Sequence, residues 1–200
     1  MGTVEKLKPL YACVQQEVFR HLPNNLFYHI ELHTQNVMAN AMLLSEEAQL
    51  SSRQEELLYA AAILHDTGYG KKYKSNEGVA SLLAGKLLPD FGFLPDEIEI
   101  VQNMILATNL IINPGSKLEM LLSDADMGYL GQEDFLIWSD RLLREWRLHH
   151  IFNGTDKEWL EGQKQFVKKY RYNTLEAGQL FNAGKATNLA YLNSLEEWPY

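Results

Sequence analysis

The chain has 200 residues, a formal net charge of −8 at pH 7, and 46% hydrophobic residues. A chain of this length suits one domain and can bury roughly 70% of the surface that it exposes when unfolded. Folding therefore requires neither a disulfide framework nor a structural metal. The negative charge argues against duplex nucleic acid or another general polyanion as a partner.

The composition also points to a compartment. The single cysteine, Cys13, has no partner within the chain, which fits a reducing compartment and predicts a buried free thiol. The first eight residues carry three charged side chains and no apolar segment, so we expect no secretory signal. The longest clearly apolar run, residues 57–64, is much shorter than the roughly 20 residues that a membrane span needs. We expect a cytoplasmic protein without a membrane partner, and the sequence leaves the oligomeric state open.

Apolar residues recur mainly at helical spacing, and no convincing alternating strand is present, so the sequence predicts an all-α fold. We find no low-complexity linker and no clear internal repeat. The prediction is one domain over residues 1–200, a helical bundle of about eight or nine helices. The expected helices cover residues 4–21, 26–48, 52–68, 76–89, 95–109, 116–128, 132–149, 155–170 and 174–196.

Several helix ends carry recognisable signals. Ser52 and Glu55 match a capping box, in which each side chain bonds to a backbone amide of the other residue. Gly68 is expected to end this third helix, because glycine tolerates left-handed dihedral angles. Asn76 is expected to cap the fourth helix, and Pro95 to occupy the first turn of the fifth.

His29 and His33 lie four residues apart, so their side chains would leave the same face of the expected helix 26–48. This pair invites comparison with zinc metalloproteases, which place a glutamate directly after the first histidine to act as a base beside the metal. Here Glu31 comes two positions after His29, about 200° around the helix. The glutamate would point away from both histidines, so we reject the metalloprotease hypothesis.

Two further groups of polar residues follow. His65 and Asp66 are adjacent at the expected end of the third helix, where the constraint that separates neighbouring side chains by about 100° is relaxed. Asp124 and Asp126 lie on a later expected helix, about 200° apart. We expect one of these two aspartates to face a metal ion and the other to orient a histidine ligand.

Two imidazoles and two carboxylates beside apolar helix faces would be costly to bury without a cation or full pairing. This mixed donor set suits one divalent transition metal, namely manganese, iron, cobalt, nickel or zinc, better than calcium. Four protein ligands would leave one or two open positions, where water becomes acidic enough to supply hydroxide near neutral pH.

In order and context, these residues resemble the signature of the HD superfamily of metal-dependent phosphohydrolases. That family has a histidine, then a His-Asp pair, then an aspartate, on separate helices of an all-helical fold. The resemblance spans about residues 26–130, and the helices 132–196 would pack on this core. The stretch after Phe135 also resembles a group of uncharacterised predicted HD phosphohydrolases. The matching segments are Tyr28-His29, His33-Thr34 with Val37, Leu64-His65-Asp66-Thr67-Gly68 and Asp124-Ala125-Asp126.

The resemblance implies a role for each of these positions. It implies that the metal ligands are His33, His65, Asp66 and Asp126. Asp126 is preferred over Asp124 because family members commonly carry an Ala-Asp step there; Asp124 would be a neighbouring or alternative ligand. His29 is similar to a histidine of cyclic-nucleotide phosphodiesterases in this superfamily that protonates the leaving oxygen.

The number of metal ions follows from a departure from the family. Members with two metals use extra histidines after the His-Asp pair. This chain has Asn76, Glu77 and Thr108 there and no histidine between residues 66 and 148. A single metal ion is therefore favoured.

The resulting prediction is an enzyme that uses a metal-activated water to hydrolyse a small phosphorylated substrate. The resemblance alone makes a nucleotide the expected substrate class. Asp66 would also orient the attacking water. Monoester, cyclic diester and pyrophosphate substrates remain open. The loop lysines Lys71, Lys72 and Lys74, together with Glu77, are candidates for contact with the phosphate, although such loops are commonly just solvated. Two alternatives also remain: a catalytically silent metal-containing nucleotide sensor, and a structural helical protein with an empty polar pocket.

Overall fold

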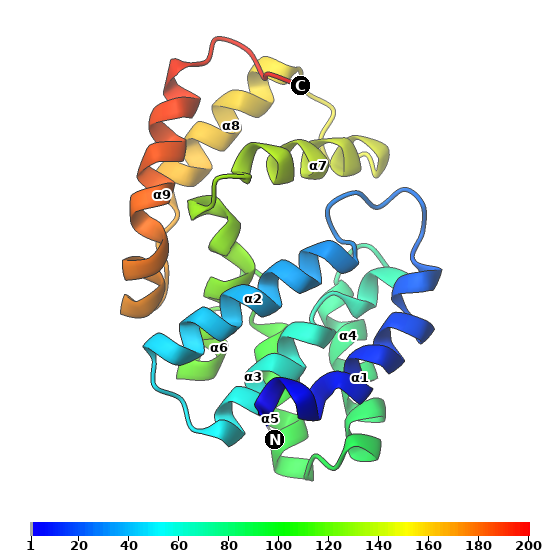
Figure 1. Cartoon of the computed structure of the whole chain (residues 1–200). Coiled ribbons are helices and arrows are strands. Elements are labelled where there is room, and N and C mark those ends of the chain that lie inside the picture. Colours follow the sequence, from blue (N-terminus) through cyan, green and yellow to red (C-terminus); the bar gives the residue numbers. More distant parts are fainter. Residues whose placement is uncertain (1) are drawn as a thin grey trace. The chain divides into compact units, whose positions relative to one another are not determined.

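Helices form all the regular structure of residues 2–200, which the computed structural model describes (Figure 1). Within that range there are nine α-helices, four short 3-10 helices (η) and no strand, which confirms the all-α prediction. No helix of these residues is both long enough and apolar enough to cross a membrane. The elements are α1 (Thr3–Glu17), η1 (Phe19–His21), α2 (Glu31–Glu47), α3 (Ser52–Leu64), η2 (Thr67–Gly70), α4 (Asn76–Leu87), η3 (Leu88–Phe91), α5 (Pro95–Leu106), α6 (Lys117–Asp126), η4 (Met127–Gly131), α7 (Phe135–Leu148), α8 (Asp156–Lys169) and α9 (Leu175–Ser194).

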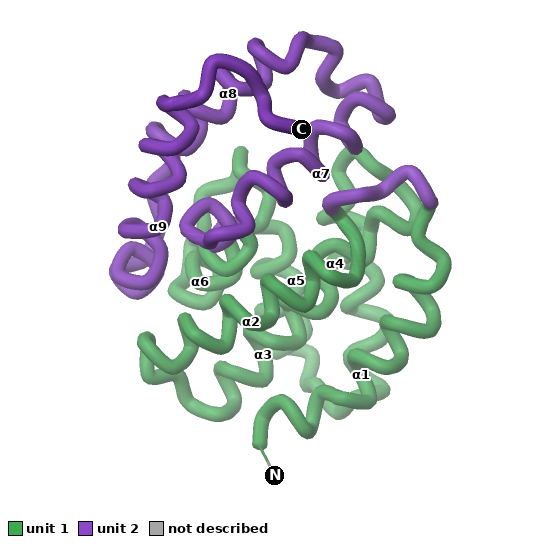
Figure 2. The backbone as a smooth tube through the Cα atoms, turned by 45° about the horizontal axis from the view of Figure 1, so that its top comes forward, with its two compact units in different colours: residues 1–23, 29–126 green, residues 24–28, 127–200 purple. Residues whose placement is uncertain are grey.

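The chain forms two compact units (Figure 2). The N-terminal unit contains the chain up to Pro23 and the segment His29–Asp126, and the C-terminal unit contains Asn24–Tyr28 and Met127–Tyr200. Two compact units are compatible with one domain or with two, so the single domain over residues 1–200 stays a prediction.

Helix α3 is the centre of the N-terminal unit. It contacts α1, α2, α4, α5 and α6. Every residue from Glu56 to Leu64 is buried, as expected for a helix that is covered on all sides. The run Ala60-Ala61-Ala62 is fully buried, and its small side chains allow the neighbouring helices to approach closely. The apolar run of residues 57–64 is thus the core of this unit, and the last residues of the run are buried in its interior.

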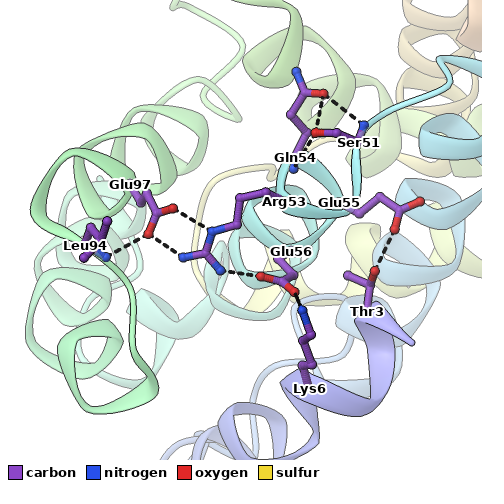
Figure 3. A network of polar contacts seen from close by, with 9 residues as sticks. All are labelled: Thr3, Lys6, Ser51, Arg53, Gln54, Glu55, Glu56, Leu94 and Glu97. Atoms are coloured by element: carbon purple, nitrogen blue, oxygen red, sulfur yellow. Dashed lines mark hydrogen bonds and ion pairs between the residues drawn. The ribbon is translucent and has the colours of Figure 1, made fainter. Parts of the chain in front are cut away.

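A polar network ties the start of α3 to two neighbouring helices (Figure 3). Arg53 on α3 donates to Glu97 on α5, with 2.6 Å between its Nε and Oε1, and also pairs with Glu56. Lys6 on α1 pairs with the same Glu56, and Thr3 donates to Glu55 at 2.7 Å. The pKa of Glu97 is lowered mainly by its hydrogen bonds with the Arg53 guanidinium. The network therefore fixes how α1 and α5 meet the first turn of α3.

Two helix ends differ from the sequence prediction. The capping box of α3 is formed by Ser51 and Gln54, one residue earlier than expected, with the Gln54 amide nitrogen donating to Ser51 Oγ at 3.4 Å. Ser75, not Asn76, is the N-cap of α4, and it has a left-handed φ of 58°. Both N-caps lie one residue before the predicted position, because Ser51-Ser52 and Ser75-Asn76 each place two capping residue types side by side. Pro95 does begin α5.

The C-terminal unit is built around aromatic side chains. Trp159 packs edge-on against Trp146, Phe152 and Trp198, with ring centroids 5.3–6.3 Å apart. Tyr28 likewise meets Trp138 at 5.6 Å. The buried Glu145 carboxylate accepts hydrogen bonds of 2.8 Å from the backbone amides of Phe27 and Tyr28, which attaches residues 24–28 to this unit. Trp138, Trp159 and Trp198 are therefore part of the core of this unit.

Helix α9 meets η4 at backbone distance in the same unit. A Cβ atom placed on Gly184 would lie 1.9 Å from the carbonyl oxygen of Gly131. Asn188, one turn later, donates to the carbonyl oxygens of Leu130 and Gln132 at 2.9 and 2.8 Å. These contacts require glycine at position 184, because any side chain would push the two backbones apart.

Replacing Gly184 with alanine should therefore destabilise the protein by about 2–4 kcal/mol, because the atom that it meets is backbone and cannot turn aside. Urea unfolding measures the change. Gly162→Ala is the matched control, since a Cβ there on α8 meets nothing within 4 Å and should stabilise by about 0.5–1 kcal/mol. Equal effects of the two replacements would contradict the proposed contact.

Candidate functional site

The end of α3 prepares His65 to act as a ligand. His65 is completely buried and its Nδ1 lies 2.8 Å from the carbonyl oxygen of Ala62. A carbonyl can only accept, so Nδ1 carries the proton and a neutral ring leaves its Nε2 lone pair available. The Thr67 hydroxyl donates to Leu64 O at 2.7 Å. Side chains thus satisfy two carbonyls of the last helical turn and fix the imidazole at the same time.

Four side chains from three parts of the unit bring donor atoms together. His33 Nε2 lies 3.4 Å from His65 Nε2, 3.3 Å from Asp66 Oδ2 and 3.0 Å from Asp126 Oδ1. His65 Nε2 lies 3.1 Å from Asp66 Oδ2 and 3.8 Å from Asp126 Oδ1. Ligands at about 2.1 Å from one ion are separated by roughly 3.0–3.4 Å at adjacent positions. The donor atoms of His33, His65 and Asp66 therefore have the spacing of adjacent ligands in a coordination shell.

The chemistry of the cluster fits a divalent cation. One ligand atom from each of His33, His65 and Asp66 lies within 4.8 Å of the others, and two of the three residues are buried. Asp66 Oδ2 is itself buried and receives no hydrogen bond of normal geometry. A buried carboxylate oxygen facing two imidazole nitrogens needs a positive charge, which a proton or a metal ion can supply. These residues could hold a metal; its identity and the set of ligands stay predictions.

A hydrogen bond places the end of α6 beside α2. Asn40, two turns after His33 on α2, donates to the carbonyl oxygen of Ala125 at 2.9 Å. This bond fixes the step between Asp124 and Asp126. The cluster distances involve Asp126, whose side chain is partly exposed, whereas Asp124 is fully buried on the same helix and has polar interactions of its own. That arrangement agrees with the expected divergence of the two side chains around the helix.

Gly68 holds the turn after the His-Asp pair in place, for a reason that the sequence did not suggest. Helix α3 ends at Leu64, earlier than predicted, and η2 follows at Thr67. Among the described residues, Gly92 is the glycine with a positive φ, so Gly68 does not end a helix in left-handed geometry. A Cβ on Gly68 would instead lie 2.0 Å from the carbonyl oxygen of Asn76. Glycine allows the turn and the start of α4 to touch.

His29 lies outside the helix that was expected to carry it. Helix α2 begins at Glu31, because Ile30 is extended with φ −122° and ψ 169°. His29 nevertheless stays close to the cluster, with its ring centroid 6.1 Å from that of His33. It also stacks on Tyr69 at 3.8 Å. Sequence reasoning missed Tyr69, although its position three residues after Asp66, one 3-10 turn along, was a usable signal.

The residues expected to bind phosphate lie in an exposed loop and on the adjoining helix. Lys71, Lys72 and Lys74 are exposed in the loop around residues 71–75, and Glu77 is half-buried on α4. Lys71 lines a mostly apolar cavity of about 370 Å³ together with Lys86 of α4. Within residues 2–200, the walls of that cavity include none of the four cluster residues. A role of these lysines in binding phosphate therefore stays a prediction.

Electrostatics couple the members of the cluster. Burial alone would lower the pKa of His65, but the carboxylates of Asp66 and Asp126 outweigh it and raise that pKa to about 9. Burial alone would likewise raise the pKa of Asp66, yet the positive charge of His65 holds it well below its usual range, with a smaller contribution from His29. Without a metal, the cluster binds a proton more tightly than a free histidine does.

We expect the metal-free protein to lose stability as the pH rises from 6.5 to about 9. The pKa of His65 in the folded state lies above its unfolded value of 6.5. The proton therefore stabilises the fold fully below pH 6.5, and this stabilisation is lost as the pH rises to about 9. Thermal unfolding in a chelator, compared between wild type and His65→Gln, measures this effect. A melting temperature that changes equally with pH in both proteins would contradict it.

Residues 31–127 match the family model of the HD domain. That segment begins at the start of α2 and ends just after Asp126, so it contains His33, His65, Asp66 and Asp126. No curated protein and no solved structure matches the chain. The match over α2 to α6, with the helical fold and the His-Asp cluster inside it, identifies residues 31–127 as an HD domain, the domain of the HD superfamily.

Proposed function

We propose that the chain is a metal-dependent phosphohydrolase that cleaves a phosphate ester of a small substrate, with a nucleotide as the substrate class. The observation that carries the proposal is the cluster of His33, His65 and Asp66, whose donor atoms lie 3.1–3.4 Å apart, with Asp126 Oδ1 3.0 Å from His33 Nε2. The presence of a domain of the HD superfamily favours hydrolysis of a phosphate ester as the reaction. The nucleotide rests on resemblance to that family.

The residues of the cluster have separable tasks in this proposal. His33, His65, Asp66 and Asp126 would hold one divalent transition metal: manganese, iron, cobalt, nickel or zinc. When bound, such an ion polarises a phosphoryl oxygen and lowers the pKa of a coordinated water. Asp66 would orient the attacking water, because its carboxylate has a second oxygen besides Oδ2. His65 would stay in one tautomer through its bond to Ala62 O.

The leaving group needs a proton, and His29 is the residue that we assign to supply it. Its imidazole lies at the edge of the cluster and is half-buried, so it is accessible to a substrate. Its charge also acts on Asp66, which places it within electrostatic reach of that carboxylate. Lys71, Lys72 or Lys74 would bind the phosphate charge, since their exposed loop follows directly on η2.

The proposal is tested by metal content and turnover. Purified wild-type protein should retain about one equivalent of metal after dialysis, and His33→Ala should lose it. Metal-loaded protein should hydrolyse at least one member of a panel of phosphomonoesters, phosphodiesters and nucleotides. His150→Asn is the control, because His150 is exposed and has a φ of 55° that asparagine tolerates. A protein that holds metal but hydrolyses no substrate of the panel would overturn the proposal that the chain is an enzyme. Nucleotide binding that Asp66→Ala abolishes would then support the alternative, a catalytically silent nucleotide sensor.

A further inference from the structure

The position of His29 poses a structural question. Because Ile30 is extended, the imidazole of His29 gains no orientation from α2. A side chain that transfers a proton must be held within a narrow range of positions, since a displacement of about 1 Å can cost roughly 100-fold in rate. Neighbouring side chains must therefore hold the ring of His29.

Two tyrosines provide such contacts. The ring of Tyr69 stacks on His29, with centroids 3.8 Å apart and an interplanar angle of 21°. Tyr73 meets the edge of the same imidazole at 6.0 Å and 89°. The tyrosines also contact one another, at 5.1 Å and 75°. We call Tyr69 and Tyr73 the aromatic clamp; it covers one face and one edge of the imidazole.

The clamp is attached to the cluster through the backbone. The amide of Tyr69 donates to the carbonyl oxygen of Asp66 at 3.1 Å, inside the turn that begins η2. The preceding residue, Gly68, is in close contact with the backbone of Asn76. The turn that Asn76 contacts thus connects the His65-Asp66 pair to Tyr69. A ring stacked on Tyr69 is held in a fixed relation to the two ligands.

We propose that Tyr69 is a positioning residue that holds the imidazole of His29 beside the cluster of expected metal ligands by face-to-face stacking. Tyr73 would support the edge of the same imidazole. The inference rests on the proposed function only in giving His29 a proton to donate; the stacking itself is independent of any turnover. Tyr69 acts through its ring and not through its hydroxyl. Phenylalanine should therefore replace it, and leucine should not.

Imidazole NMR tests the stacking without any substrate. In histidine-labelled full-length protein, the ring protons of His29 should be displaced upfield by the ring current of Tyr69, and His29→Gln identifies their signals. The displacement should persist in Tyr69→Phe and disappear in Tyr69→Leu. Tyr191→Leu, at a half-exposed tyrosine of α9, is the matched control and should leave these signals unchanged. His29 signals that do not respond to Tyr69→Leu would overturn the clamp.

Kinetics test whether the clamp serves catalysis. With metal-loaded protein and 4-nitrophenyl phosphate or bis(4-nitrophenyl) phosphate as the probe, Tyr69→Leu should lower kcat roughly 10- to 100-fold. KM should change little, metal content should stay at the wild-type level, and Tyr69→Phe should restore kcat. Combining Tyr69→Leu with His29→Ala should cost no more than His29→Ala alone, because both remove one function.

The outcomes separate the two proposals. If wild-type protein turns over neither probe nor any other phosphate ester, the proposed function fails, and the NMR result alone decides the clamp. If wild-type protein is active and the effects of Tyr69→Leu and His29→Ala multiply, Tyr69 does not act through His29 and the inference is overturned. Loss of metal in Tyr69→Leu would also overturn it, because Tyr69 would then support the ligands and not the imidazole.

Discussion

Asp66→Ala should lower the affinity for the metal by at least about 100-fold and reduce hydrolysis to background. Asp66 Oδ2 lies close to both histidines, 3.3 Å from His33 Nε2 and 3.1 Å from His65 Nε2. Removing it takes away one of the four expected ligands, and the remaining two imidazoles and one carboxylate were not arranged to hold the ion alone. Competition with a chromophoric chelator measures the affinity, and the active substrate of the panel measures the turnover.

The fold should survive this replacement, which makes the result interpretable. Asp66 carries a buried charge, and without a metal its partner is the proton on His65, whose pKa should fall once the carboxylate is gone. Asp90→Ala, at an exposed aspartate of η3, is the control and should retain metal and activity. An Asp66→Ala protein that binds metal as tightly as Asp90→Ala would show that Asp66 is not a ligand.

Gly68→Ala should destabilise the protein by at least about 3 kcal/mol and release the metal. A Cβ at this position would lie 2.0 Å from the carbonyl oxygen of Asn76 and 2.7 Å from its carbonyl carbon. Both are backbone atoms at the start of α4, so either the turn or the helix must move. Since Asp66 is two residues away on the same turn, its carboxylate would leave the cluster. Urea unfolding and metal analysis measure the two effects.

Another glycine of the same region provides the control for this prediction. Gly78 lies two residues after Asn76 on α4, and a Cβ there meets nothing within 4 Å. Gly78→Ala should therefore keep the metal and stabilise the helix by about 0.5–1 kcal/mol. If Gly68→Ala proved as stable as Gly78→Ala, then the tight approach of η2 to α4 would not exist in solution.

The central parts of the fold and the candidate site were within reach of the sequence. The apolar run of residues 57–64 predicted the helix that became α3, because its length and spacing leave few other structures for it. His65 and Asp66 stood out because two polar residues directly follow this buried run. His33 and Asp126 could be added only by their resemblance to a family pattern, since spacing alone cannot show that separate helices meet.

Other features were beyond the sequence because they depend on contacts between distant segments. Nothing in the residues around Gly68 indicates that the backbone of Asn76 lies against it. The sequence therefore predicted only that Gly68 ends a helix. The extended Ile30 was equally hidden, because residues 26–30 continue the helical spacing of α2. His29 was therefore placed on a helix face, and the tyrosine that stacks on it was overlooked.

The central position of α3 has a practical consequence for domain boundaries. The family match starts at residue 31, whereas α1 ends at Glu17 and lies wholly outside it. Yet α1 contacts α3 and buries Leu7, Leu10 and Val14. A fragment trimmed to residues 31–127 would expose the apolar face of α3 that α1 covers, and it would be prone to aggregate. Expression trials of this unit should therefore begin upstream of α1, with the boundary set by helix packing and not by similarity to relatives.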